Sequence, residues 1–229
     1  MYAMGVMKHT MDNKELITHL KSQKKDNAGF IDSLKIAYRP LICPFEDLLP
    51  LIPKQSSVFD VGCGSGMFLS LVQHFRNPSK MGGIEISQQL IANANEVLNA
   101  DEHPHVTLAT FDGVNIPATI SDFQYICMID VFHHIPPRQQ NEFLIQLFKK
   151  MGKGSFLIFK DIDGSSLLSY WNKFHDLLLS GDMGNEPTIP ALKELIHDDA
   201  KMVIKQFYKR RMFLYPHFTL VLQKRGQQG

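Results

Sequence analysis

A glycine-rich stretch from Val58 to Phe68, VFDVGCGSGMF, carries the residues whose types and spacing best suit a ligand site. An apolar run leads into an acid, Asp60, and is followed by glycines at every second position, Gly62, Gly64 and Gly66. Apolar residues at helical spacing come next, so the pattern predicts a strand, a tight turn and a helix. Such a unit brings backbone N–H groups and a helix N-terminus to a sheet edge, where glycine leaves room for a ligand.

The glycine spacing separates this turn from two common nucleotide-binding loops. The dinucleotide fingerprint needs GxGxxG, whereas residues 62–66 read GxGxG and Met67 stands where the third glycine would be. No Gly-Lys-Ser or Gly-Lys-Thr follows, which excludes the phosphate-binding loop of ATPases. The stretch therefore favours an adenosine ligand other than NAD.

Two acids stand at the ends of the next two predicted strands. Glu85 lies 19 residues past Gly66, where a carboxylate can accept hydrogen bonds from both hydroxyls of a ribose. Asp112, within Phe111-Asp112-Gly113, can accept a hydrogen bond from the exocyclic amine of adenine. The structural alternatives are a strand end in solvent for Glu85 and a plain Asp-Gly turn for Asp112.

Two adjacent histidines, His133 and His134, follow the strongly apolar segment 123–130. Ligands of α/β proteins bind at the carboxyl ends of strands, so either imidazole is placed to act as a general base near neutral pH. The alternative is that one histidine packs and the other bonds the backbone. Cys127 lies inside the apolar segment and is predicted to be a small buried side chain, not a nucleophile. Asp161 ends the following strand and is a further candidate for the pocket.

These residues require a scaffold in which strands and helices alternate. The pattern predicts strands over residues 56–62, 80–86, 106–113, 123–130 and 154–163, and helices over 65–75, 87–100 and 136–151. Alternation of this kind produces right-handed βαβ units and an α/β sheet. Two final strands within 201–224 predict a hairpin with a tight turn near residues 210–212, and the basic run 209–211 is expected in that solvated turn.

Helical segments flank this core on both sides in the sequence. Residues 1–54 predict an N-terminal helical lid, with an amphipathic helix over 11–25 and a short helix from Pro44. Residues 55–229 form the main domain, with a helical insertion at about 164–200 that contains a long helix over 165–181. Aromatic residues in that helix indicate either an apolar wall of a substrate pocket or simple core packing; they are Tyr170, Trp171 and Phe174.

Composition and charge narrow the functional classes. The chain has 229 residues, 44% hydrophobic and 21% charged, which suits one sizeable domain with a packed core. A formal net charge of +1 argues against a dedicated nucleic-acid binder. Three separated cysteines without CxxC spacing predict neither a disulfide framework nor a metal site. No apolar run suits a signal peptide or a membrane span, so we expect a cytoplasmic protein. We further expect a monomer or homodimer.

Taken together, the motifs resemble those of class I S-adenosylmethionine-dependent methyltransferases. DVGCGSG, the strand end at Glu85, FDG and IDVFHHIPP occur in the family's order over residues 56–161. The resemblance implies a Rossmann-like, doubly wound, mostly parallel seven-stranded sheet with helices on both faces and an antiparallel C-terminal hairpin. It also implies S-adenosyl-L-methionine as cofactor and S-adenosyl-L-homocysteine as product. The residues implied to bind the cofactor are Asp60, Gly62, Cys63, Gly64, Gly66, Glu85, Ile86, Asp112, Gly113, Ile129 and Asp130.

The methyl acceptor is indicated mainly by exclusion. The sequence has neither the Asn-Pro-Pro-Tyr motif of amino-methylating nucleic-acid enzymes nor the Pro-Cys motif of cytosine-carbon methylation. IDVFHHIPP resembles members that methylate small molecules and lipids, so we expect a small-molecule or lipid-like acceptor, with His133 or His134 as base. The alternatives are an RNA or protein methyltransferase, a non-catalytic S-adenosylmethionine-binding partner protein, and an NAD or nucleotide-sugar enzyme.

Overall fold

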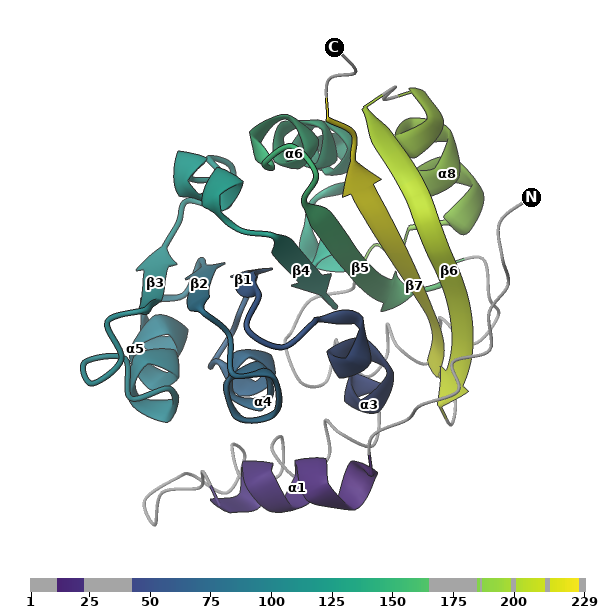
Figure 1. Ribbon diagram of the computed structural model, residues 1–229. Helices are drawn as coiled ribbons and strands as arrows, with labels where there is room; N and C mark the ends of the chain where they lie inside the picture. Colours follow the sequence, from purple (N-terminus) through teal and green to yellow (C-terminus); the bar gives the residue numbers. More distant parts are fainter. Residues whose placement is uncertain are drawn as a thin grey trace. The chain divides into compact units, whose positions relative to one another are not determined.

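A computed structural model describes residues 12–22, 43–164, 185, 187–198, 201–212 and 215–226 of the chain (Figure 1). The long helix predicted over 165–181, with its candidate pocket wall of Tyr170, Trp171 and Phe174, lies outside the described residues. The structure has two compact units, which divide between Gly113 and Val114. The predicted division into a lid, 1–54, and a main domain, 55–229, stays a prediction.

The unit that ends at Gly113 is built on three parallel strands. Its elements are α1 (Asn13–Ser22), α3 (Phe45–Leu48), η1 (Leu49–Leu51), β1 (Ser57–Val61), α4 (Met67–Arg76), β2 (Lys80–Glu85), α5 (Gln88–Val97) and β3 (Val106–Thr110). β2 pairs with β1 and β3, which sets Asp60 opposite Gly83 and Glu85 opposite Thr110. α5 packs on β2, β3 and α4 (Figure 1). Ser87 caps the N-terminus of α5, as predicted, because its hydroxyl accepts the N–H of Leu90 at 3.3 Å.

The described part of the unit that begins at Val114 contains four strands. Its elements are η2 (Ala118–Asp122), β4 (Tyr125–Ile129), η3 (Phe132–His134), α6 (Pro137–Lys150), β5 (Phe156–Ile162), α8 (Ile189–Asp198), β6 (Met202–Met212) and β7 (Tyr215–Lys224). β4 and β5 are parallel, with Ile129 opposite Lys160. β7 runs antiparallel to both β5 and β6, and α8 packs on β6 (Figure 1). The carboxyl ends of β4 and β5 therefore lie together, which matters for the histidines that follow β4.

The seven strands form one mixed sheet in the order β3-β2-β1-β4-β5-β7-β6, with helices flanking it. The Rossmann-like fold with an antiparallel C-terminal hairpin is thereby confirmed. Among the described helices, none is both long enough and apolar enough to cross a membrane.

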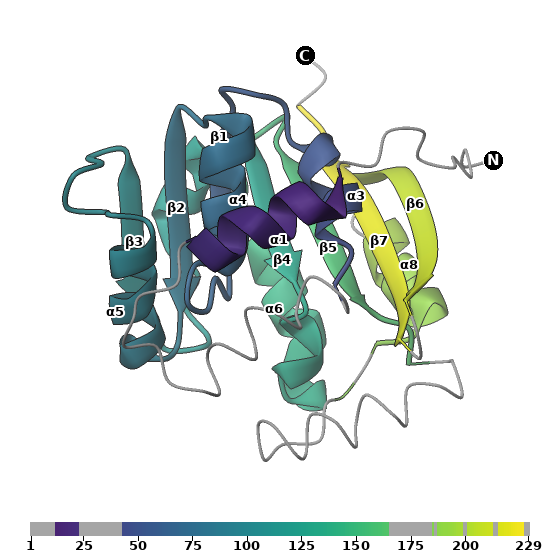
Figure 2. The same ribbon diagram turned by 90° about the horizontal axis from the view of Figure 1, so that it is seen from below.

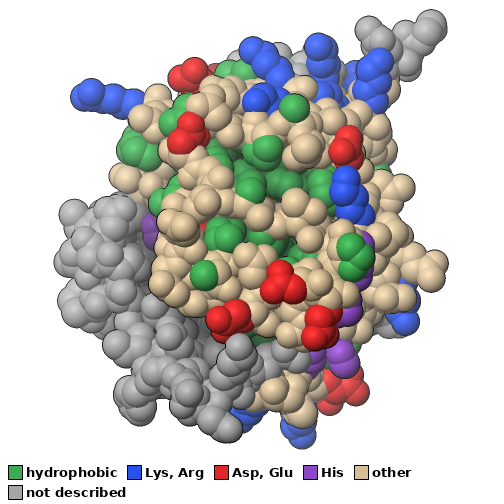
Figure 3. Space-filling model, turned by 90° about the vertical axis from the view of Figure 1, so that its left-hand side faces the viewer, with side chains coloured by type: hydrophobic (Ala, Val, Ile, Leu, Met, Phe, Trp, Pro, Cys, Tyr) green, Lys and Arg blue, Asp and Glu red, His purple; other side chains and the backbone are tan. Residues whose placement is uncertain are grey.

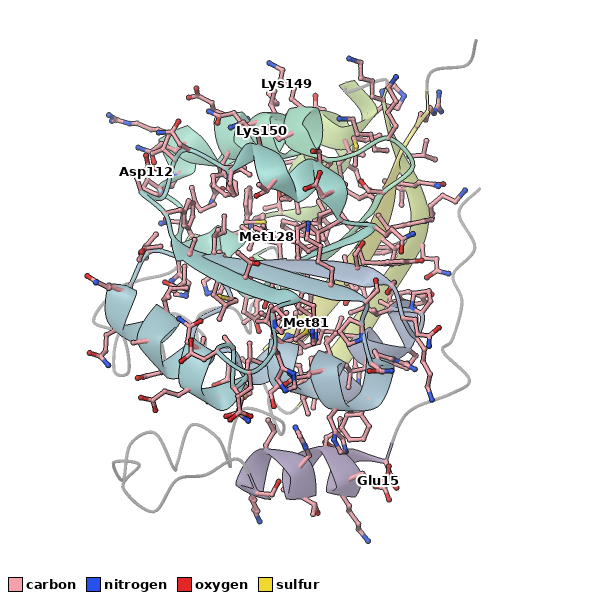
Figure 4. All side chains as sticks on the ribbon, turned by 60° about the vertical axis from the view of Figure 1, so that its left-hand side comes forward. Glu15, Met81, Asp112, Met128, Lys149 and Lys150 are labelled. Carbon is pink, nitrogen blue, oxygen red and sulfur yellow. The ribbon has the colours of Figure 1, made fainter. Side chains whose placement is uncertain are left out.

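The middle strands are almost continuously apolar because a sheet covered on both faces buries every residue. All of β1 is buried, and in β4 only Tyr125 is partly exposed. Met81 of β2 and Met128 of β4 are completely buried (Figure 4). Cys127 of β4 is also completely buried, which confirms its predicted role as a packing residue.

The C-terminal hairpin is longer than the sequence predicted. β6 continues through Met212, which pairs with Tyr215 of β7. The prediction of a turn near residues 210–212 is therefore wrong. Strand β6 tolerates its basic run because it lies at the end of the sheet order, where alternate side chains reach solvent. One member of the run, Lys209, has its Nζ 2.9 Å from Oδ2 of the buried Asp163.

Helix α1 packs on α4 through a pair of histidines (Figure 2). The rings of His19 and His74 stack with centroids 4.2 Å apart, and His19 Nε2 lies 2.9 Å from the Ser70 hydroxyl. Glu15, one turn earlier, lies on the exposed side of α1 (Figure 4). Burial, and to a smaller extent the neighbouring His74, lower the pKa of His19 from its usual value. The neutral form of His19 is therefore the one that suits the docked helix.

We expect the docking of α1 to weaken as the pH falls. A histidine with a lowered pKa in the folded state contributes its full stability above the unfolded pKa of about 6.5 and loses it below that value. Hydrogen exchange of the α1 amides should therefore report a smaller opening free energy at about pH 5.5 than at about pH 7.5. His19→Gln keeps a group that can hydrogen-bond Ser70 but does not titrate. The protection of the α1 amides in this variant should therefore be the same at both pH values. Equal protection of wild-type α1 at both pH values would contradict the prediction.

Candidate functional site

The glycine turn joins the end of β1 to the start of α4. Gly62, Gly64 and Gly66 have φ values of +76°, +54° and +79°, in the left-handed region that glycine adopts without strain. A Cβ on Gly66 would lie 3.1 Å from Cβ of Ala94, so this glycine allows α5 to approach the turn. A Cβ on Gly64 would meet nothing within 4 Å. The turn is therefore closed by protein at Gly66 and open at Gly64.

The N–H groups of this turn are largely used within the protein. Those of Gly62 and Cys63 both donate to the carbonyl oxygen of Ile84, at 2.8 and 3.0 Å. The N–H of Gly64 donates to Oε2 of Glu85 at 3.1 Å. Loops that hold phosphates present such N–H groups to the anion, which this turn does not do. The backbone donors expected at this edge from the sequence are thus mostly committed to the fold.

The surroundings of the turn carry negative charge. Asp60 is buried in β1, and Cys63 directs its sulfur toward β2, where a Cβ on Gly83 would lie 3.0 Å from it. Burial first, and then the charges of Asp60 and Glu85, raise the pKa of the Cys63 thiol. The thiol is therefore neutral and fills space beneath the turn. Because the negative charges of Asp60 and Glu85 both reach the Cys63 thiol, the turn is better suited to a cation than to an anion.

Glu85 is held at the end of β2 by three backbone donors. Its Oε2 accepts the N–H of Gly64, and its Oε1 accepts those of Ile86 and Ser87 at 2.9 and 3.2 Å. The carboxylate thus ties the glycine turn to the strand end instead of extending into solvent. Glu85 is only partly exposed, and its Oε2, which accepts only one of these three bonds, can accept a further hydrogen bond.

Exposed apolar surface lies next to Glu85. Ile86 is 66% exposed, which is exceptional for a large hydrophobic side chain in the described part of the chain. Gly113 lies beside it, because a Cβ on Gly113 would be 3.6 Å from Cγ2 of Ile86. Asp112 is exposed on the loop after β3 (Figure 4). Figure 3 shows a face on which hydrophobic side chains are exposed among polar atoms. An exposed apolar side chain that directly follows the Glu85 carboxylate suits a flat ring with a polar edge.

In the unit that begins at Val114, a tight turn follows Ile129 of β4. Asp130 has a φ of +54°, its N–H donates to the carbonyl oxygen of Lys160 at 2.9 Å, and its Oδ1 lies 2.5 Å from Lys160 Nζ. Lys160 of β5 has no exposed surface. A buried ammonium is stable only beside a counter-charge, so this ion pair holds Asp130 in its left-handed conformation.

The two histidines have different environments. His133 is buried, with its Nδ1 2.6 Å from Oδ1 of Asp161 and its backbone N–H 3.2 Å from Oδ2. His134 is exposed, and its ring centroid lies 4.0 Å from that of His133. Sequence reasoning identified both histidines and Asp161 as candidates but did not predict the hydrogen bond between His133 and Asp161. It also missed Lys160. The available signal was a Lys-Asp pair inside an apolar strand, where charges need partners.

Comparison with known proteins identifies the family. A family model described as a methyltransferase domain matches residues 35–199. The chain belongs to this methyltransferase family. The protein is an S-adenosylmethionine-dependent methyltransferase, and S-adenosylmethionine is its cofactor. No curated protein matches this methyltransferase in sequence.

Solved structures share the fold of the methyltransferase at low sequence identity. A SAM-dependent methyltransferase from Aquifex aeolicus superposes with a TM-score of 0.64 at 17% identity, over 85% of this chain and 96% of that one. Magnesium protoporphyrin IX methyltransferase from Synechocystis, solved with bound SAH, gives 0.64 at 15% identity, over 93% and 95%. A putative sarcosine dimethylglycine methyltransferase from Galdieria sulphuraria gives 0.59 at 12% identity, over 78% and 81%.

Proposed function

We propose that this methyltransferase transfers a methyl group from S-adenosylmethionine to a small-molecule or lipid-like acceptor. The observation that carries the acceptor class is the charge balance of 24 basic against 23 acidic residues, whose excess of one positive charge is too small for a surface dedicated to a nucleic-acid backbone. The structural relatives from Synechocystis and Galdieria sulphuraria are named for magnesium protoporphyrin IX and for sarcosine and dimethylglycine, which are small molecules.

The residues of the glycine turn fit the charged end of this cofactor. The cofactor supplies a methyl group already activated on a sulfonium. Asp60 and Glu85 make the turn electronegative, and the open space at Gly64 leaves room for a ligand. No side chain caps α4 at Gly66, so the first N–H groups of this helix can receive a carboxylate. We assign the amino-acid part of the cofactor to Asp60, Gly62, Cys63, Gly64 and Gly66, with Cys63 acting by its packing beneath the turn.

The strand ends fit the nucleoside part. Glu85 is held by three backbone donors and is positioned to accept from the ribose hydroxyls. Ile86 and Gly113 offer apolar contact to the adenine ring, while Asp112 accepts from its amine. Ile129 and Asp130, at the end of β4, are proposed to complete the cofactor site; their role rests on the family's motif order.

The turn after β4 supplies the candidate base. Methyl transfer to oxygen, nitrogen or sulfur requires removal of a proton from the acceptor whenever that atom is protonated. His133 and His134 lie on this turn, and an imidazole is suited to the task near neutral pH. Alignment of acceptor and methyl group, with exclusion of water, is the other contribution expected of the protein.

A labelled-methyl assay tests the acceptor class. Wild-type protein is incubated with methyl-labelled S-adenosylmethionine and a cell extract that has been separated into small-molecule, lipid, RNA and protein fractions. We expect label in the small-molecule or lipid fraction, and mass spectrometry then identifies the product. Label confined to RNA or protein would contradict the proposal. Cofactor binding by calorimetry without label in any fraction would support a non-catalytic binding protein instead.

A further inference from the structure

The carboxylate of Asp161 determines which nitrogen of His133 carries a proton. Asp161 has no exposed surface, and its oxygens accept hydrogen bonds from the His133 and Ile162 backbone N–H groups. Its Oδ1 also lies 2.6 Å from His133 Nδ1. The same Asp161 oxygen, Oδ1, also accepts the Ile162 N–H, and a carboxylate that acts as an acceptor at both oxygens requires Nδ1 of His133 to be the donor. Neutral His133 therefore has its lone pair on Nε2.

The turn that carries His133 is fixed at several other points. The His133 carbonyl oxygen accepts the N–H of Asn185 at 2.7 Å. Gln140 of α6 donates to the carbonyl oxygens of Phe132 and Ile135, on either side of the two histidines, at 3.2 and 3.1 Å. The Lys160–Asp130 ion pair holds the start of the same turn. A base with a fixed tautomer on a rigid turn is the arrangement that proton abstraction requires.

We propose that His133, rather than His134, is the general base of methyl transfer and that Asp161 is the positioning residue that sets its tautomer. This inference rests on the proposed function. The acceptor proton passes to Nε2 of His133 as the acceptor atom uses its lone pair to bond the methyl carbon. The electron pair of the broken carbon–sulfur bond stays on sulfur, which becomes a neutral thioether. The positive charge is then on the imidazolium, which Asp161 stabilises.

A purely structural role for Asp161 is the main competing explanation. In that role, Asp161 would stabilise the fold without changing the rate of methyl transfer by the folded enzyme. Asp163 offers a matched control, because it is also buried near the end of β5 and pairs with Lys209 at 2.9 Å. Asp163→Asn removes the same charge from the same part of the fold but has no contact with His133 among the described interactions.

The first arm of the test needs no acceptor. Nitrogen-15 NMR of the full chain reports the protonated nitrogen of each histidine, and His133→Gln assigns the signal. We expect His133 to carry its proton on Nδ1 above neutral pH. A proton on Nε2 in the wild-type protein would overturn the assignment.

The second arm measures label transfer to the small-molecule and lipid fractions at saturating cofactor. Asp161→Asn and His133→Gln should each lower the rate by about 100-fold, with cofactor half-saturation changed less than about threefold. The double variant should be no slower than either single variant, because the two residues act as one unit. Asp163→Asn should keep the wild-type rate per folded molecule.

In the label-transfer arm, three results would overturn the inference. They are a normal rate for folded Asp161→Asn, additive losses in the double variant, and a loss confined to His134→Gln. If wild-type protein labels no fraction, the proposed function fails and the base role fails with it, while the NMR arm still decides whether Asp161 sets the tautomer.

Discussion

Replacing Glu85 with glutamine is expected to weaken S-adenosylmethionine binding by about 10- to 100-fold. Hydrogen bonds to a charged group contribute about 1.5–3 kcal/mol, and about 1.4 kcal/mol corresponds to a factor of ten in affinity. The glutamine oxygen can replace one carboxylate oxygen but not both, so either the bond to Gly64 or those to Ile86 and Ser87 are lost. Titration calorimetry with the wild-type protein and Glu85→Gln measures the difference.

Two controls separate binding from folding in this experiment. Glu102→Gln removes the same charge from an exposed position after α5 and should bind the cofactor like wild type. His133→Gln should also bind the cofactor normally, because we assign it to proton transfer. Thermal denaturation shows whether Glu85→Gln is folded at the titration temperature. Wild-type affinity in folded Glu85→Gln would contradict the ribose assignment.

Much of the fold follows from local sequence patterns. β1, β2, β4 and β5 are apolar runs bounded by glycine, serine or an acid, and each lies within the segment predicted for it. Ser87 caps α5 because a hydroxyl before an apolar-periodic segment can accept a helical N–H. Glu85 at the end of β2 was identifiable for the same reason, since strand and helix signals meet at that residue.

The pairings between distant residues did not follow from local patterns. Asp161 lies 28 residues beyond His133, and only the parallel pairing of β4 with β5 brings them together. The hydrogen bonds from the N–H groups of Gly62 and Cys63 to the carbonyl oxygen of Ile84 likewise depend on how β2 lies beside β1. The hairpin turn was misplaced because Lys209 reads as solvated until its buried partner Asp163 is known. In each case, tertiary pairing decides what a local pattern leaves open.

Replacing Gly64 with alanine is expected to reduce cofactor affinity by about tenfold or more with a small loss of stability. The new Cβ meets no protein atom within 4 Å, so the fold bears only the strain of a left-handed alanine at φ +54°. That strain costs about 1–2 kcal/mol. If the open space beside Gly64 receives the cofactor, the methyl group occupies part of it. Calorimetry for binding and thermal denaturation for stability measure the two effects separately.

Gly154 provides a matched control for this substitution. It has a φ of +80°, and a Cβ there also meets nothing within 4 Å, but it lies before β5, away from the glycine turn in the sequence. Gly154→Ala should therefore lose similar stability and keep wild-type cofactor affinity. Gly66→Ala should instead lose more stability than either, because its Cβ would lie 3.2 Å from the backbone of Ala94. Equal affinities for Gly64→Ala and Gly154→Ala would show that the open side of the glycine turn does not hold the cofactor.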